Sequence, residues 1–213
     1  FWVYGGRASS DNWWYEQIGI PQKHADILLF DIEGVTAEEL KVLRDEAAKG
    51  SIFNEVIGPR ITERPVLSTG ANLMDKLVIS FKIAVATQNE GEIVRLIKLL
   101  ENELRVFPQI RKDEFGEDAE GIKPDYSFHQ HVDQVQFGGY GEVFVNDVNT
   151  ILSLVSGTKY MINEKAQNEY LNFILSGMQW AFRNEYKDFT TTGRSITRPN
   201  GSKGIYQGVK KAA

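Results

Sequence analysis

Residues 71–87 read ANLMDKLVISFKIAVAT, and this stretch sets the fold class. Leu73, Leu77, Phe81 and Val85 recur along it at four-residue intervals, which places them on one face of an α-helix. A helix with one apolar face is stable only when that face packs against another element. The stretch therefore predicts an amphipathic helix that belongs to a packed helical domain.

The sequence on either side of this stretch continues the helical pattern. Residues 92–106 (EIVRLIKLLENELRV) repeat the apolar spacing, and Pro108 ends the predicted helix. Upstream, residues 36–39 (TAEE) form a capping-box pattern that predicts a helix ending at Gly50. Two further helices are predicted, at residues 142–155 and 165–186.

The remaining sequence predicts little regular β-structure. Residues 111–125 are rich in acids and glycine and read as a long loop, and only residues 135–137 carry a weak strand signal. Long helices joined by glycine-rich loops are typical of antiparallel helical hairpins. We therefore expect an all-α chain.

Size, composition and charge narrow the function classes. With 213 residues the chain can bury a substantial core, and it has no apolar run near the ~20 residues that span a bilayer. It has no cysteine, so disulfides, thiol nucleophiles and thiolate metal sites are excluded. The net charge of −5 argues against a nucleic-acid partner. The opening residues 1–6 (FWVYGG) lack both Met and a signal-peptide pattern, so we expect a piece of a longer protein.

Residues 127–140 (SFHQHVDQVQFGGY) carry the strongest functional signal. His131 precedes Tyr140 by nine residues, and the tyrosine lies among glycines whose bare backbones let a ligand approach closely. Histidine and tyrosine are two of the few side chains that transfer protons in enzymes. The stretch predicts an acid–base site.

Aromatic residues near the N-terminus are candidates for sugar binding. Trp13 and Trp14 follow Asn12, and neighbouring residues of a helix point about 100° apart, so both rings do not easily enter one core. The alternatives are a core aromatic pair or a stacking platform for sugar rings, with Asn12 bonded to hydroxyl groups.

Two other segments carry polar groups that suit an anionic ligand. Asn72 follows a predicted helix start at Ser68 or Thr69, and its uncharged amide can bind a carboxylate or simply occupy a helix. Arg194 and Arg198 lie four residues apart in a loop bounded by glycine and proline. They are either solvated surface arginines or forked donors to a carboxylate or sulfate.

A metal site is the weaker interpretation of the histidines. His129 and His131 form a His-x-His pair, and further ligands would have to come from Asp133 and the distant His24. Nothing in the spacing requires that set, and His129 also fits a buried structural role. We predict no metal and no cofactor.

Four segments together resemble polysaccharide lyase family eight, which includes chondroitin AC, hyaluronate and xanthan lyases. They are found in the same order and at similar intervals across most of the chain, and residues 135–140 are nearest to the chondroitin AC branch. The segments are residues 12–14 (NWW), 69–72 (TGAN), 130–141 and 193–199.

The resemblance implies a fold and roles for individual residues. It implies an incomplete (α/α) toroid over residues 1–213, as a single partial catalytic domain. The family's catalytic residues fall on Asn72, His131, Tyr140 and Arg194. Its substrate-binding positions fall on Asn12, Trp13, Trp14, Gln130 and Arg198. The β-sandwich domains and a catalytic glutamate that follow in the family have no counterpart in this chain.

The implied reaction is β-elimination at a uronic acid of an acidic polysaccharide, with chondroitin sulfate or hyaluronan favoured. Tyr140 is the preferred proton-transfer group and His131 the rival base. Xanthan cleavage, hydrolysis by paired carboxylates and a non-catalytic sugar-binding module are the alternatives. A polymer substrate does not cross a membrane readily, so we expect a secreted or periplasmic location. We also expect a monomer with no nucleic-acid or membrane partner.

Overall fold

Helices dominate the computed structural model, as the apolar spacing predicts. The structure describes residues 11–30, 34–52, 68–112, 118–199, 201 and 203. The opening residues 1–6 lie outside this part. Among the described residues the α-helices are α1 (Ile20–Phe30), α2 (Ala37–Ala48), α3 (Gly70–Ala86), α4 (Glu90–Leu104), α5 (Glu142–Val155) and α6 (Glu164–Ser176).

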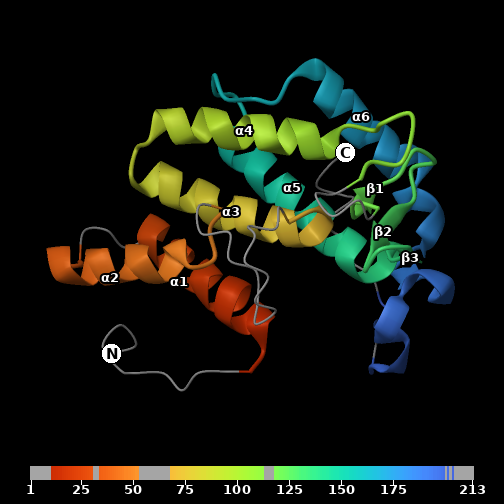
Figure 1. Ribbon diagram of the computed structural model, residues 1–213, viewed down its shortest axis with the longest axis horizontal. Helices are drawn as coiled ribbons and strands as arrows, with labels where there is room; N and C mark the ends of the chain where they lie inside the picture. Colours follow the sequence, from red (N-terminus) through yellow and green to blue (C-terminus); the bar gives the residue numbers. More distant parts are fainter. Residues whose placement is uncertain are drawn as a thin grey trace. The chain divides into compact units, whose positions relative to one another are not determined.

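Short turns and strands complete the described part of the chain (Figure 1). The helical turns are η1 (Tyr15–Gly19), η2 (Phe137–Gly141), η3 (Met178–Ala181), η4 (Phe189–Thr191) and η5 (Gly193–Thr197). The strands are β1 (Gly121–Ile122), β2 (Phe128–Gln130), β3 (Gln134–Val135), β4 (Phe182–Arg183) and β5 (Tyr186–Lys187).

Four of the predicted helices are confirmed. At α2 the Thr36 hydroxyl accepts the Glu39 N–H at 3.3 Å, and the Glu39 carboxylate accepts the Thr36 N–H at 2.9 Å, so the capping box forms as predicted. The bounds of α3 and α4 lie within two residues of the predictions, and those of α5 agree with them. The all-α class is confirmed, and the toroid stays a prediction.

The predicted fifth helix, residues 165–186, is wrong in its second half. α6 ends at Ser176, and Gly177 follows where a Cβ would lie 2.1 Å from the Tyr126 carbonyl oxygen. The chain then forms η3 and the β4–β5 hairpin, which turns at Asn184 with a φ of 58°. The close approach of Tyr126 is a tertiary contact, so helical spacing does not reveal it.

One helix was missed and one strand misplaced. α1 was not predicted, although Ile18, Ala25 and Leu28 are buried at helical spacing. The strand predicted at residues 135–137 is β3, which lies slightly earlier because Phe137 opens η2. β1 also falls inside the stretch read as a loop.

The chain divides into two compact units, and each is described by itself. Unit 1 comprises Phe1–Leu67 and Asp75–Leu96, and unit 2 comprises Ser68–Met74 and Ile97–Ala213. No helix in the described part is both long and apolar enough to span a bilayer.

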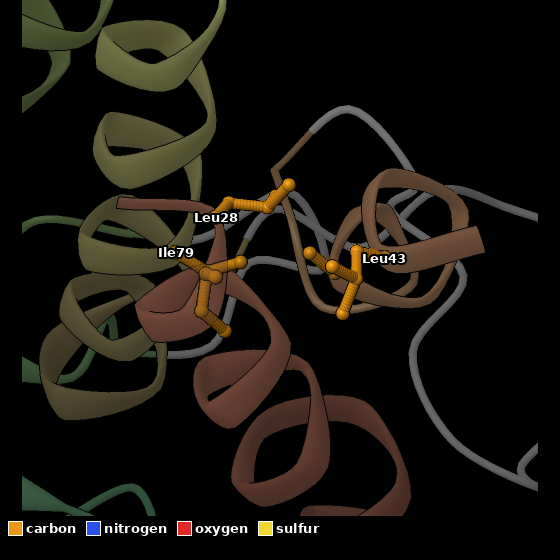
Figure 2. Close-up of a cluster of buried hydrophobic side chains, with 5 residues drawn as sticks. Leu28, Leu43 and Ile79 are labelled. Atoms are coloured by element: carbon orange, nitrogen blue, oxygen red, sulfur yellow. The ribbon is translucent and has the colours of Figure 1, made fainter. Parts of the chain in front are cut away.

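Unit 1 has a core formed by three helices. Figure 2 shows Leu28 of α1, Leu43 of α2 and Ile79 of α3 converging, and all three are at most 2% exposed. Ala25 and Ala47 belong to the same cluster, and their small side chains let α1 and α2 approach closely. Burial of each large aliphatic side chain contributes about 1.5–3 kcal/mol to folding.

Unit 2 contains a small sheet beside an aromatic core. β1, β2 and β3 pair antiparallel in sequence order, with Ile122 opposite Phe128 and Gln130 opposite Gln134 (Figure 1). Phe128 packs against Phe144 and Phe173, with ring centroids 5.1 and 6.1 Å away. The sheet is thereby fixed to α5 and α6.

Candidate functional site

The aromatic core of unit 2 holds both ends of the segment that carries His131, and Tyr140 follows directly after its second end. Phe128 begins β2, and Phe137 begins η2, where it stacks on Phe173 with centroids 6.4 Å apart. Phe128 contacts the same Phe173 ring. Because both ends of the segment rest on one ring, the hairpin and the following turn are drawn together.

His131 occupies the first position after β2, at the tip of the β2–β3 hairpin. Its φ is 54° and that of the next residue, Val132, is 69°. Non-glycine residues rarely adopt this left-handed region, and β-branched ones least of all. The surrounding structure must therefore stabilise this turn.

The imidazole of His131 and the phenol of Tyr140 are directly hydrogen-bonded. His131 Nε2 lies 2.9 Å from Tyr140 Oη, and the two rings meet edge to face at 87° with centroids 5.0 Å apart. In this arrangement a neutral imidazole whose Nε2 carries no proton accepts a hydrogen bond from the phenol O–H. The predicted acid–base pair is therefore assembled by the fold.

Arg194 supplies a positive charge beside this pair. Its guanidinium carbon lies 5.9 Å from the centroid of the Tyr140 ring. η5 carries the arginine, and the preceding Gly193 has a φ of +51°. The positive φ favours glycine at this position, and a Cβ on Gly193 would come 2.6 Å from Oε1 of the buried Gln136.

Burial lowers the pKa of His131, and the charge of Arg194 lowers it further. Both effects disfavour the imidazolium, so His131 is neutral at pH 7. The folded protein therefore binds a proton at the His131 imidazole less tightly than the unfolded chain does. The contribution of His131 to stability is therefore complete above pH ~6.5 and is lost as pH falls through the lowered pKa.

We expect Arg194→Gln to raise the pKa of His131 toward its ordinary value, because one of the two causes of the shift is removed. The measurement is an NMR titration of the histidine ring protons, with the signal assigned by its loss in His131→Asn. Arg183→Gln, at an exposed arginine of β4, is the control and leaves the pKa unchanged. An unchanged pKa in Arg194→Gln would contradict the electrostatic role of this arginine.

A buried ion pair fixes the turn that carries Tyr140. Lys187 Nζ donates to the Gly138 carbonyl at 3.1 Å and to Glu142 Oε2 at 2.8 Å. The two charged side chains are only 7% and 9% exposed. Lys187 thus joins β5 to both ends of η2, and Gly138 leaves room for it, since a Cβ there would lie 2.4 Å from Lys187 Cδ.

Replacement of Lys187 by Met should lower the free energy of unfolding by about 3–5 kcal/mol, because Glu142 is left as a buried charge without this partner. Lys49→Met is the matched control, because its pair with Glu46 is exposed and its loss costs at most ~1 kcal/mol. Urea unfolding measures both. Equal losses in the two variants would show that the buried pair does not stabilise the turn.

Asn72 lies in the first turn of α3, and its side chain is half-buried. The N–H of the preceding residue, Ala71, donates to Oε1 of Gln130 at 3.2 Å. Gln130 precedes His131, so one hydrogen bond joins the segments that carry two of the predicted catalytic residues. Gln130 is fully buried, and both ends of its amide bond protein atoms, which favours a positioning role.

The arginine and the tryptophans that are predicted to bind substrate are exposed. Arg198 follows η5 at the surface. Trp13 and Trp14, at 37% and 41% exposure, belong to unit 1, where the Trp14 indole N–H donates to Asp75 at 3.4 Å. Asn12 Oδ1 accepts the Trp14 N–H at 3.1 Å. Neither ring is buried in a core, as the angle between neighbouring helical residues predicts.

His129 differs from His131 in its surroundings. It lies within β2, its Nδ1 is buried without a hydrogen-bond partner, and burial lowers its pKa. Among the described residues no group of three or more His, Asp or Glu side chains is arranged to hold a metal ion.

Three supporting residues were not predicted: Glu120, Glu142 and Lys187. Glu120 lies in the acidic stretch read as a loop, and Lys187 lies just beyond the stretch assigned to a helix. Their partners are 11 and 45 or more residues away in the chain, so no local pattern identifies them.

The sequence matches a described family over nearly its whole length. The family is "Polysaccharide lyase family 8, N terminal alpha-helical domain", and the match covers residues 3–212. Chondroitinase-AC of Pedobacter heparinus is 28% identical over 205 residues, which are 94% of this chain and 26% of that protein. Hyaluronate lyase HylB of Cutibacterium acnes is 25% identical over 206 residues, which are 92% of this chain and 24% of that protein.

The fold also matches a solved structure. A chondroitinase AC lyase determined with oligosaccharides superposes with a TM-score of 0.74, at 24% identity, over 96% of this chain and 27% of that one. At this identity the match establishes the fold alone. The chain spans about a quarter of the length of each of these relatives.

Proposed function

The chain belongs to polysaccharide lyase family 8, whose N-terminal α-helical domain it matches, and we propose that it carries the proton-transfer groups of such an enzyme. The proposed reaction is cleavage of a uronic-acid polysaccharide by β-elimination. The observation that carries the proposal is the 2.9 Å hydrogen bond between His131 and Tyr140, with Arg194 beside the phenol ring. Elimination needs a base for the C5 proton and an acid for the leaving oxygen on C4, and Tyr140 is proposed to serve as both in turn.

In the proposed reaction Tyr140 Oη takes the proton from C5 of the uronate. The C5–H electron pair forms the C4–C5 double bond, and the C4–O bond breaks with its pair on the glycosidic oxygen. Tyr140 returns the proton to that oxygen. The products are a new chain end and an unsaturated uronate, with no net change in charge.

The base must lose its own proton first, and a free phenol is a poor base at neutral pH. A phenol in water has a pKa near 10, so forming the phenolate at pH 7 costs about 4 kcal/mol. Neutral His131 is hydrogen-bonded to the phenol oxygen through Nε2, and Arg194 places a positive charge beside the phenol ring. His131 as the direct base is the rival assignment.

Asn72 is proposed to neutralise the uronate carboxylate. Removal of the C5 proton pushes a second negative charge onto that group, and preorganised donors at such a point are worth about 10²–10³ in rate. An amide donates without placing a fixed charge near the base. Arg194 and Arg198 are proposed to bind further carboxylate or sulfate groups, and Trp13 and Trp14 to stack on sugar rings.

Chondroitin sulfate and hyaluronan are the proposed substrates, because they correspond to the names of the relatives matched over most of this chain. A polymer of this size does not cross a membrane readily, so we propose action outside the cell or in the periplasm.

The test is ultraviolet absorbance of the full-length protein that contains this chain, incubated with chondroitin sulfate, hyaluronan and xanthan. A rising signal from the unsaturated uronate supports elimination, and the fastest polymer identifies the substrate. New reducing ends without that signal would indicate hydrolysis and overturn the proposal.

A further inference from the structure

We infer that Glu120 is a positioning residue that holds His131 and the start of α3, which carries Asn72, in one arrangement. The inference rests on the proposed function for its catalytic meaning and on the geometry of unit 2 for its structural content. Glu120 bonds the backbone of His131 and the side chain of Gln130, so it acts on the site through these two neighbours.

The two oxygens of the Glu120 carboxylate serve two adjacent residues of the hairpin. Oε1 accepts the backbone N–H of His131 at 2.7 Å, and Oε2 accepts the side-chain amide of Gln130. His131 has its φ in the left-handed region, which is unfavourable for a non-glycine residue unless neighbours stabilise it. The bond to Oε1 is a charge-assisted bond of the kind that offsets such a cost.

The same residue is attached to α3 by two routes. Its own N–H donates to Thr69 Oγ1 at 3.1 Å, just before the helix begins. Its carboxylate bonds Gln130, whose Oε1 accepts the N–H of Ala71 at 3.2 Å. Asn72 is the next residue, so its position follows from this chain of bonds.

Gly70 lets these groups come together. Its φ is +60°, and a Cβ on it would lie 2.8 Å from Gln130 Oε1 and 3.1 Å from Glu120 Cβ. The N–H of Gly70 itself donates to Glu103 Oε1 at 2.8 Å. Arg111 donates to the other oxygen of Glu103, also at 2.8 Å. Glu120 is therefore one member of a network in which the donors and acceptors match.

The electrostatic surroundings of Glu120 agree with a positioning role. Burial raises its pKa and the nearby charge of Glu103 adds to the rise, while the N–H groups of His131 and Val132 oppose it. Burying a carboxyl group in this way is unfavourable unless its hydrogen bonds are made.

The arrangement predicts which substitutions break the network and which pair repairs it. In Glu120→Gln the new amide nitrogen, a donor, faces either Gln130 Nε2 or the His131 N–H. Each of these is also a donor, so a hydrogen bond is lost at that point. Turning the Gln130 amide only moves the conflict to the Ala71 N–H. In the double variant Glu120→Gln with Gln130→Glu, every donor again faces an acceptor, with the same total charge.

The experiment measures kcat and KM of the full-length protein for the three variants with the fastest polymer, beside melting temperatures. We expect Glu120→Gln and Gln130→Glu each to lower kcat by about 10- to 100-fold with KM nearly unchanged. The double variant should regain most of the lost kcat. Wild-type kcat in Glu120→Gln, or no recovery in a folded double variant, would overturn the inference.

A second readout separates this inference from the proposed function. The NMR signal of the His131 ring should shift in Glu120→Gln and return in the double variant, whether or not the protein cleaves any polymer. If the wild-type protein shows no elimination but the signal moves as expected, the proposed function fails and the positioning role stands. A His131 signal unaffected by all three substitutions would reject the positioning role.

Discussion

We expect Tyr140→Phe to lower kcat by a factor of about 10³ or more and to leave binding of the polymer nearly unchanged. General acid–base catalysis by a positioned side chain is worth about 10²–10⁴ in rate, and Tyr140 is proposed to serve twice, as base and as acid. The substitution removes only the hydroxyl group. The ring keeps its edge-to-face contact with His131 and its place beside Arg194.

The measurement is initial rate by uronate absorbance together with the Kd of the polymer for the same variants. Tyr160→Phe is the matched control, because this tyrosine contacts Lys159 outside the candidate site, and it should keep wild-type kcat. If Tyr140→Phe kept more than about a tenth of the wild-type rate, the proton-transfer role would pass to His131.

The second large effect is expected at Asn72. Asn72→Ala should lower kcat by about 10²–10³, because the carboxylate that gains charge loses its neutral donor. Asn72→Asp should lower it further, since a fixed negative charge beside that carboxylate opposes the second one. Comparison of the two variants therefore separates charge from the mere loss of a side chain.

Rates and KM values of both variants are measured on the polymer that the wild-type protein cleaves fastest. Asn102→Asp, at an exposed position of α4, is the control for added charge and should not change kcat. An Asn72→Asp variant as active as the wild type would exclude Asn72 from the neutralising role.

Local patterns were sufficient for most of the helices. The capping box at Thr36, the four-residue spacing in residues 71–87 and the spacing in residues 92–106 each act within a few turns, and each produced a helix with nearly the predicted bounds. These signals concern neighbours in sequence, because a helix satisfies its backbone within its own segment.

The error at the fifth predicted helix has a tertiary cause. α6 ends at Ser176, and a carbonyl from Tyr126 occupies the space that a Cβ on Gly177 would need. Residues 182–187 then form a hairpin against the helical expectation. Such contacts join residues some 50 positions apart. They override helical tendencies without leaving a local mark in the sequence.

Local sequence patterns were enough for the helical class and most helix bounds, because these depend on short spacings. The candidate site residues were predicted from their chemistry and from the family resemblance, and their roles stay predictions. Only the tertiary structure brought His131 to 2.9 Å from Tyr140 and placed Arg194 against the same ring. It also revealed the supporting bonds of Glu120 and Lys187. The reason is that hydrogen-bond geometry within a site depends on how distant segments pack on a shared core, here the rings around Phe173.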